Sequence, residues 1–373
     1  MSEIFICGCG AVSPAGWGVP ALREALARGE PLPTSELARP GWNRGLQVRP
    51  VPAPSPRPAF LGHPRLRRAS PITHHAVAAA LEALGEDAPK DGQFTRRLGV
   101  ILCVMSGCIV YSRRFYDETL KDPATASPLV FPETVFNAPA SHLAAVLETS
   151  AINYTLVGDP GTFLQGVALG ADWLLSDQVD ACLVIGAEEM DWLKADACRL
   201  FDRQVIVSDG AGALYLKRRS DQNPAIKLGA VTQAHLFSSH QSREQAARRA
   251  RAELGRSQPD QLLCDGCQGA PHSDRAEQMA WSDWPGARVS PKKVLGEGLM
   301  AAAAWQCVVA IAALQQGNYA AANVSVVGCD QQAIAARFVR VSLRKGNPVH
   351  DDNNTAVYWG GRRIGDRANS LSP

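Results

Sequence analysis

The sequence has little net charge, and no secretory leader pattern opens it. Its 38 Lys and Arg residues nearly balance 36 Asp and Glu residues, which leaves a formal net charge of +2. Nucleic-acid and anionic-membrane binders carry a larger basic excess, so we expect neither partner. Because no leader is recognised, we expect a cytoplasmic protein whose ten cysteines are reduced and mostly buried.

Long apolar runs are also lacking. The stretch 298–314 has 17 residues, many of them Ala, and it carries Gln306. A membrane-spanning helix needs about 20 strongly apolar residues. We therefore expect this stretch to be a helix packed tightly inside the protein, without membrane insertion.

What the sequence does contain is a repeated pattern. Residues 166–189 and 304–331 each read as an apolar helix, a short polar loop and a buried strand that ends in Gly and an acidic residue. A Gly-containing turn precedes each helix. In a chain of 373 residues, of which 46% are hydrophobic and 20% charged, this pattern predicts an α/β protein built from two similar halves.

One absence is local, at the front of the first of these helices. Residues 159–162 read Asp-Pro-Gly-Thr and include no cysteine. The N-terminus of a helix carries free N–H groups and partial positive charge, which lower the pKa of a thiol and stabilise an oxyanion. Two such junctions meeting between the halves would form an acyl-transfer site, and here the expected nucleophile is missing.

Six segments, in chain order, resemble the β-ketoacyl synthases, the condensing enzymes of the thiolase fold. They are residues 5–18, 129–147, 179–191, 206–219, 261–269 and 290–306; the second contains the family's Phe-Pro-x-Thr-x-x-Asn pattern at Phe131, Pro132, Thr134 and Asn137. The resemblance implies a thiolase-like fold with two similar halves in five αβαβα layers. It places the halves at residues 1–217 and 218–373 of one compact unit.

The sequence departs from the family at its catalytic positions. The cysteine's place falls on Pro160 or Gly161, the first histidine's place on Asp265, and the second histidine's place on Glu297. Condensation needs a thiolate to carry the acyl chain and imidazoles to support the enolate. Carboxylates at the histidine positions would repel an enolate, so we expect no catalytic residues among these four.

Two further motifs accompany these positions. Lys292 and Gly296 keep the family's register around Glu297. The family's Gly-Phe-Gly-Gly gating loop is expected within residues 346–361, where residues 351–355 read Asp-Asp-Asn-Asn-Thr instead.

The resemblance therefore implies a non-catalytic subunit similar to the chain-length factors of type II polyketide or aryl polyene systems. Its partners would be an active ketosynthase, in a heterodimer, and an acyl carrier protein; no cofactor or metal is expected. Two alternatives stay open. The chain could be a stand-alone acyltransferase or thioester hydrolase with Asp265 or Glu297 as base, or a carrier-protein-binding scaffold with no tunnel.

Other candidate sites have simpler interpretations. Cys264, Cys267 and His272 could hold a metal, but a closed zinc site usually needs two such pairs, so buried thiols are favoured. Packing is likewise expected for Cys7, Cys9, Cys103 and Cys108, and ordinary surface or core roles for His74, His75 and His142.

Three expectations concern partners. The basic helix 242–256 could bind an acidic carrier protein through Arg243, Arg248, Arg249 and Arg251, or form a solvated surface. Tyr111 and Phe115 are four residues apart, so on a helix they share a face. They are either plugs of the acyl tunnel or core aromatics. The strand 180–189 is expected at the sheet edge that pairs across the dimer, in an interface of roughly 2,000 Å² or more.

Overall fold

In the described residues, the main sheet has twelve strands, and ten of them form two five-stranded parts of the same design at the centre of the molecule, called here the first and the second sheet. The computed structural model describes residues 3–89, 94, 96–342, 358–359 and 362–363. The first sheet runs from the centre to the edge as β1 (Phe5–Ser13), β9 (Gly210–Lys217), β7 (Ala181–Glu188), β5 (Leu98–Val104) and β6 (Ile152–Val157). The second runs as β10 (Ala225–Val231), β15 (Gln332–Val341), β14 (Ala321–Val327), β12 (Gln261–Cys264) and β13 (Ala287–Val289).

Strand direction repeats between the two sheets. In the first, β5 lies parallel to both β6 and β7, and β9 lies antiparallel to β7 and β1. In the second, β12 lies parallel to β13 and β14, and β15 lies antiparallel to β14 and β10. Antiparallel pairing of Phe5 with Lys227 and of Ile6 with Ile226 joins the sheets along β1 and β10.

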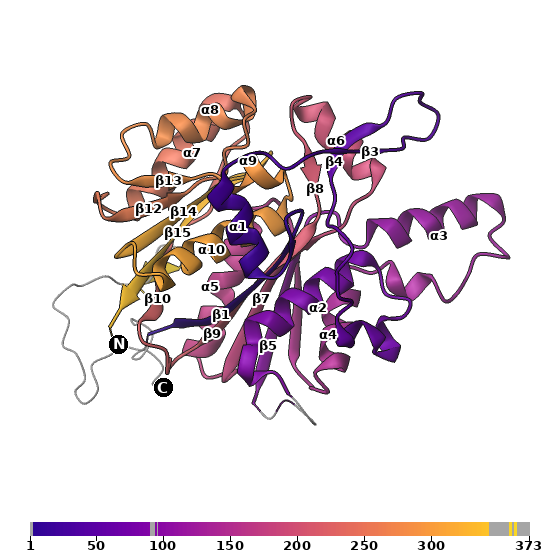
Figure 1. Cartoon of the computed structure of the whole chain (residues 1–373), viewed down its shortest axis with the longest axis horizontal. Helices are drawn as coiled ribbons and strands as arrows, with labels where there is room; N and C mark the ends of the chain where they lie inside the picture. The colour runs from indigo at the N-terminus through magenta and orange to yellow at the C-terminus, as the bar shows by residue number, and fades with distance from the viewer. Residues whose placement is uncertain (1–2, 90–93, 95, 343–357, 360–361, 364–373) are drawn as a thin grey trace, which may run out of the picture.

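Helices complete five layers (Figure 1). Between the sheets lie α5 (Thr162–Leu175) and α10 (Met300–Gln315), with α1 (Val19–Arg28) and α9 (Pro291–Leu295) beside α10. The outer face of the first sheet carries α2 (Pro71–Leu84) and α4 (Ala138–Val146), and the outer face of the second carries α7 (His240–Glu253) and α8 (Pro271–Ala280). The predicted αβαβα arrangement of two similar α/β halves is confirmed.

The Ala-rich stretch 298–314 is the buried helix that the sequence predicts. Small side chains let α10 approach the first sheet closely: a Cβ at Gly212 would lie 2.7 Å from the Cβ of Ala304. In the middle of the helix, the side-chain amide of Gln306 donates to the backbone oxygen of Ser325 at 2.7 Å. Within the described ranges, no helix is long and apolar enough to cross a membrane.

The smaller elements lie around this core. A three-stranded sheet contains β3 (Ser35–Leu37), β4 (Leu46–Arg49) and β8 (Val207–Ser208), next to α6 (Trp192–Phe201). The short strands β2 (Gly16–Trp17) and β11 (His235–Leu236) extend the main sheet, and β16 (Tyr358–Trp359) pairs with β17 (Arg362–Arg363). Single 3-10 turns span Ala59–Gly62, Pro64–Leu66, Gly85–Asp87 and Phe131–Glu133.

The helix α3 (Ile109–Lys121) differs from all the layers because it projects from the body of the molecule (Figure 1). None of its residues is buried. Tyr111 and Phe115 are therefore not core aromatics, and that interpretation of the pair is wrong.

The expected position of the strand 180–189 is also wrong. β7 is paired on both sides, with β5 and β9, and all eight of its residues are buried. Its continuous apolar run reflects burial on both faces of the sheet, which is typical of a central strand. The edge strand of the first sheet is β6, which begins at Ile152.

Candidate functional site

A cavity of about 610 Å³ lies where the two halves meet, at the N-terminal end of α5. The turn after β5, the helix α6, the loop after β12, the loop before α10 and the turn after β14 all contribute to its lining. The size is in the ordinary range for small-molecule sites. The cavity brings together Pro160 and Glu297, two of the four positions at which the sequence departs from the condensing enzymes.

Pro160 lines the cavity just before α5. Its side chain offers no nucleophile, and its backbone nitrogen carries no hydrogen to donate. Gly161 follows, and a Cβ there would lie 2.8 Å from Ile334 of β15. The front of α5 is thus packed against the second half and provides no reactive group.

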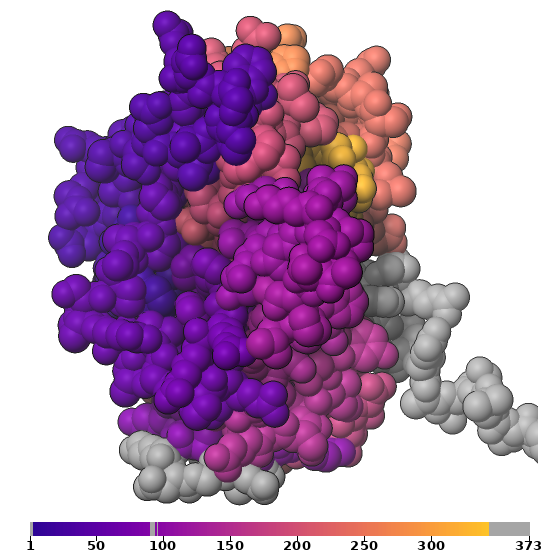
Figure 2. Space-filling model, turned by 90° about the vertical axis from the view of Figure 1, so that its right-hand side faces the viewer, coloured from indigo at the N-terminus to yellow at the C-terminus, as the bar shows by residue number. Residues whose placement is uncertain are grey.

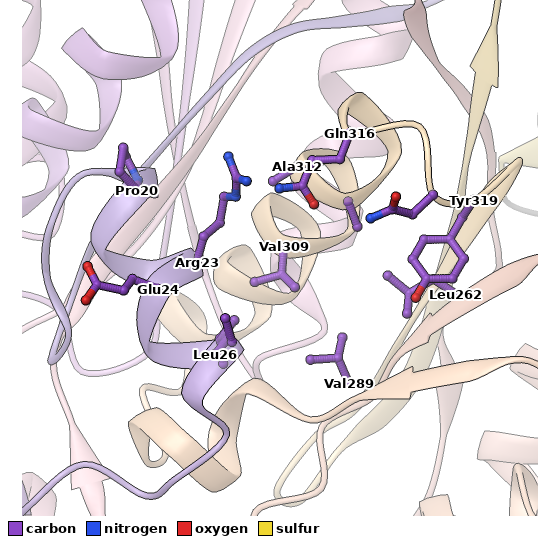
Figure 3. A pocket seen from close by; sticks show the side chains of 13 residues that line it. Pro20, Arg23, Glu24, Leu26, Leu262, Val289, Val309, Ala312, Gln316 and Tyr319 are labelled. Atoms are coloured by element: carbon purple, nitrogen blue, oxygen red, sulfur yellow. The ribbon is translucent and has the colours of Figure 1, made fainter.

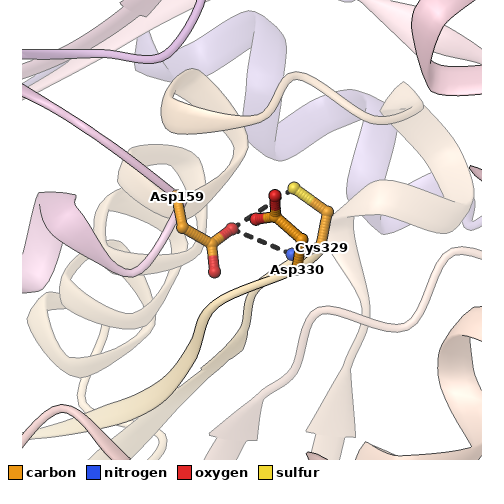
Figure 4. Close-up of side chains that lie close together, drawn as sticks. All are labelled: Asp159, Cys329 and Asp330. Carbon is orange, nitrogen blue, oxygen red and sulfur yellow. Dashed lines mark hydrogen bonds between the residues drawn. The ribbon is translucent and has the colours of Figure 1, made fainter. Parts of the chain in front are cut away.

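Asp159 ties the two halves together beside this proline (Figure 4). It is buried, and its carboxylate accepts the backbone N–H groups of Cys329 at 2.9 Å, Gln331 at 3.1 Å and Gln332 at 3.0 Å. The fit is close, because a Cβ at Gly328 would lie 1.8 Å from a carboxylate oxygen of Asp159. A residue of the first half therefore caps the β14–β15 turn of the second.

Asp159, Cys329 and Asp330 are the one group in the described part of the chain that brings three candidate metal ligands together. Both carboxylate oxygens of Asp159 already accept backbone N–H groups. Desolvation of the thiolate and the adjacent carboxylate of Asp159 hold the pKa of Cys329 well above its ordinary value, whereas a metal-binding thiol must be deprotonated. The arrangement is that of a hydrogen-bonded turn.

Asp265 does not belong to the cavity lining. Its carboxylate is buried, lies 3.3 Å from Nε of Arg288, and accepts the backbone N–H of Cys267 at 3.1 Å. Burial raises the pKa of Asp265. With its carboxylate directed to these groups, it is not placed to act as a base on a ligand in the cavity.

Glu297 does line the cavity, but its charge is paired. One carboxylate oxygen lies 2.7 Å from Nζ of Lys292, and the other accepts the backbone N–H of Leu299 at 2.8 Å. The Glu297 carboxylate is the main cause that raises the pKa of Lys292, against the opposing effect of burial. Gly296 has φ of 92° and turns the chain between these two residues.

Sequence reasoning missed Glu277, Lys194 and Arg243 as cavity residues. Glu277 is buried on α8 and accepts the backbone N–H of Gly266 at 3.0 Å. Burial, followed by the nearby Asp265, raises the pKa of Glu277 to about 8. Its spacing of 12 residues from Asp265 gives no sequence signal by itself, because only the packing of α8 on the sheet brings it to the cavity.

The thiols do not supply a replacement nucleophile. Burial is the first cause that raises the pKa of Cys198, to about 11, and it raises the pKa values of Cys103, Cys108, Cys264 and Cys267 further. A nucleophilic cysteine needs a lowered pKa. Cys198 and Cys329 are the cavity thiols in the described residues, and both are held protonated at neutral pH.

The remaining predicted residues lie elsewhere. His74 faces the backbone oxygen of Leu66, His75 packs edge-on against Trp17, and His142 contacts Glu133. Cys264 and Cys267 are buried, whereas His272 lines the cavity and packs edge-on against His240. These three do not form a metal-ligand group in the described chain. Residues 351–355, the expected gating segment, lie outside the described residues.

The basic face of α7 is largely engaged within the molecule. Arg243 donates to the backbone oxygen of Gly328, and Arg251 to that of Ala280. Arg248 pairs with Glu244 one turn away. Of the four arginines expected to bind a carrier protein, Arg249 is exposed and has no hydrogen bond in the described structure.

Tyr111 and Phe115 lie on the side of α3 that faces the segment 129–136. The ring of Phe115 packs 5.4 Å from that of Phe131. Both residues are partly exposed, and their role in a tunnel stays a prediction.

A second cavity, of about 620 Å³, lies between α1 and α10 (Figure 3). Leu26, Leu262 and Val309 line it, with Arg23 and Glu24 also contributing. It contains none of the predicted site residues.

No protein-family model matches the sequence, and no curated protein matches it. Solved structures do match. The ishigamide ketosynthase/chain length factor superposes with a TM-score of 0.76 at 19% identity, over 91% of this chain and 100% of that one. A β-ketoacyl synthase from Burkholderia phymatum gives 0.73 at 14% identity, over 91% and 100%.

A third similar structure is the ketosynthase ApeO in complex with its chain length factor ApeC from Xenorhabdus doucetiae. It gives a TM-score of 0.71 at 16% identity, over 91% of this chain and 98% of that one. The chain has the ketosynthase fold. The predicted thiolase-like architecture is thus confirmed over nine-tenths of the sequence, although at these identities the likeness concerns the fold and not the activity.

Proposed function

We propose that the chain is a non-catalytic ketosynthase-like subunit, a chain-length factor, that pairs with an active ketosynthase. The observation that carries the proposal is Pro160 at the front of α5, facing a cavity in which the thiols are held protonated and Glu297 is paired with Lys292. Such a site can hold a ligand, but it has no thiolate to carry an acyl chain. The active cysteine and histidines would come from the partner.

The surface supports a partner on the first half. β6 is an edge strand, and Tyr154 on it is 52% exposed. Earlier in the chain, Tyr116 and Leu120 of α3 are 62% and 67% exposed, and Leu129 and Phe131 after the helix are also exposed. Figure 2 looks onto this side of the molecule, where the magenta segment that contains α3 and β6 occupies the centre.

Open edges and clustered apolar side chains mark protein interfaces. We call β6, α3 and the segment 129–136 the first-half face. A ketosynthase with the same fold offers a matching edge strand, so that the two sheets would continue across the interface. The similar structures include a ketosynthase in complex with its chain length factor and a ketosynthase in complex with an acyl-carrier protein. These are the two partners that we propose for this chain.

The proposal is tested by co-expression with an active type II ketosynthase and by measuring the mass of the complex. We expect a heterodimer that condenses acyl and malonyl groups, whereas this chain alone forms no acyl adduct and no β-keto product. Tyr154→Lys and Leu120→Lys should break the heterodimer. Leu236→Lys is the matched control, because Leu236 is 77% exposed on β11 of the other half.

A covalent acyl-cysteine on the isolated chain would contradict the proposal and would favour a stand-alone acyltransferase. A heterodimer that resists both face variants would leave the catalytic part of the proposal intact and would place the partner on another surface.

A further inference from the structure

The basic residues are unevenly distributed along the chain. Between Leu37 and Leu81 the sequence has seven arginines and no acidic residue. Of the 38 basic residues, 31 therefore lie elsewhere against 36 acidic residues, so the rest of the sequence has a formal net charge of −5. The small overall charge of +2 thus conceals one strongly basic segment, which suits a negatively charged partner.

Most of these arginines are free to meet a partner. Arg39 pairs with Asp196 at 2.6 Å, and Arg49 donates to the backbone oxygen of Leu32 at 2.7 Å. The other five are exposed and take part in no ion pair within the described structure: Arg44, Arg57, Arg65, Arg67 and Arg68.

Two large apolar side chains protrude next to the start of this segment. Trp42, between β3 and β4, is 63% exposed, and Leu200, near the end of α6, is 84% exposed. Arg39 connects them, because its guanidinium carbon lies 3.9 Å from the ring centroid of Trp42 and it pairs with Asp196 of α6. Asp196 and Leu200 are four residues apart, so they share a face of that helix. Both apolar side chains thus belong to one surface, where β3, β4 and α6 lie together (Figure 1).

We call this the hairpin surface; it consists of Trp42, Leu200, Arg44, Arg199 and Arg203, all of them exposed. Its elements, residues 35–49 and 192–206, hold six basic and three acidic residues. The acids are Glu36, Asp196 and Asp202, and one of the six cations, Lys194, is buried. Five accessible cations still exceed three acids, and the exposed arginines at residues 57–68 follow along the chain. The hairpin surface is therefore both positive and apolar.

We propose that the hairpin surface binds an anionic lipid bilayer, with Trp42 and Leu200 inserted at the level of the headgroups and the arginines at lipid phosphates. Tryptophan prefers the boundary between headgroups and acyl chains, and each arginine near an anionic surface adds attraction. Hydrocarbon accepts protruding side chains of any shape, whereas an acidic protein would need a matching recess for each of them. The association is peripheral, since no helix of the described chain is long and apolar enough to cross a membrane.

This inference goes beyond the proposed function. The first-half face is formed by β6, α3 and the segment 129–136, and none of these contributes to the hairpin surface. A ketosynthase on one surface and a bilayer on the other are therefore separate contacts, and each can fail without the other.

The test is cosedimentation of the full chain with vesicles made of equal parts of phosphatidylglycerol and phosphatidylcholine, compared with vesicles of phosphatidylcholine alone. We expect binding to the anionic vesicles, weaker binding to the neutral ones, and a decrease as salt is added, because salt screens exposed charges. The measurement needs no ketosynthase, so its outcome is independent of whether the heterodimer forms.

Substitutions assign the contact to the hairpin surface. Trp42→Ala and Leu200→Ser should each lower the partition coefficient about tenfold, because each removes an inserted apolar side chain. Arg44→Gln and Arg199→Gln should each lower it about fivefold. All four side chains are exposed, so we expect the variants to fold, and their melting temperatures check this.

Three controls match these variants. Leu236→Ser removes a leucine that is 77% exposed on β11, and Arg249→Gln removes an exposed arginine of α7. Leu120→Ser alters the first-half face, which could also contact lipid in the isolated chain. All three should bind vesicles like the unaltered protein.

Absence of binding, equal binding to neutral and anionic vesicles, or unchanged binding in both Trp42→Ala and Leu200→Ser would overturn the proposal. Loss of binding in Leu120→Ser alone would also overturn it, by assigning the lipid contact to the first-half face. An acidic carrier protein that crosslinks to the hairpin surface while vesicles do not bind would overturn it in favour of a protein partner.

Discussion

The fronts of the two central helices carry a carboxylate at the same place and use it differently. Asp159 lies three residues before the start of α5, and Glu297 lies three residues before the start of α10. Asp159 accepts backbone N–H groups from the opposite half, whereas Glu297 is paired with Lys292 of its own half and lines the cavity. An acidic residue thus lies near the N-terminus of both helices, where a negative charge is favourable, but only Glu297 lines the cavity.

The difference shows that the acid of the first half has a structural role, whereas the acid of the second half faces the cavity. The first-half acid holds the β14–β15 turn in position and is removed from the ligand space. The second-half acid sets the charge of the cavity by neutralising Lys292. Each role can be broken separately.

The largest effect is expected for Asp159→Ala. The change removes the acceptor of three backbone N–H groups, one of them belonging to the buried Gln332. Unsatisfied buried donors cost about 1–3 kcal/mol each, and less where water enters, so we expect a loss of about 3 kcal/mol in the free energy of unfolding. Urea unfolding measures it. Asp159→Asn should lose less, because one oxygen remains.

Asp330→Asn is the matched control for Asp159, since its side chain is exposed on the same turn. An equal loss in both variants, or a loss below 1 kcal/mol for Asp159→Ala, would contradict the capping role.

A smaller effect is expected for Glu297→Gln. Removing one member of a buried ion pair costs about 3–5 kcal/mol, but this pair borders a cavity that water enters, so we expect about 2 kcal/mol. In a double-mutant cycle with Lys292→Met, the double variant should be more stable than the sum of the single losses predicts. Additive losses would show that the pair has no coupling.

The fold and part of this site could be predicted from the sequence alone. The apolar segments around α5 and α10 predicted the two halves, because helices without a polar face must lie between layers. The missing thiol at Pro160 was also readable. Glu277 and Lys194 were not, since they reach the cavity only through the packing of α8 and α6. The error about β7 has the same origin: a continuous apolar strand marks burial, but which strand ends the sheet depends on pairing that local sequence does not encode.

The last comparison concerns the helices that follow β5 and β12, which occupy equivalent places in the two sheets. In the second half α8 has four buried residues and packs against α7, whereas in the first half α3 has none and projects. Phe115 packs on Phe131 of the same chain and is only partly buried. Phe115→Ala should therefore lower the free energy of unfolding by about 1 kcal/mol, less than the 3–5 kcal/mol typical of a core aromatic. Tyr111→Ala should behave alike.

If these two rings close an acyl tunnel at the interface, each variant, combined with an active ketosynthase, should release a longer product while its melting temperature falls by only a few degrees. Product length, measured by mass spectrometry, together with thermal unfolding separates a role in closing the tunnel from a role as contact surface alone. Leu236→Ala is the control, because Leu236 is exposed on β11 of the other half, and it should leave product length unchanged. A product of unaltered length from both Tyr111→Ala and Phe115→Ala would remove the tunnel role and leave α3 as a contact surface alone.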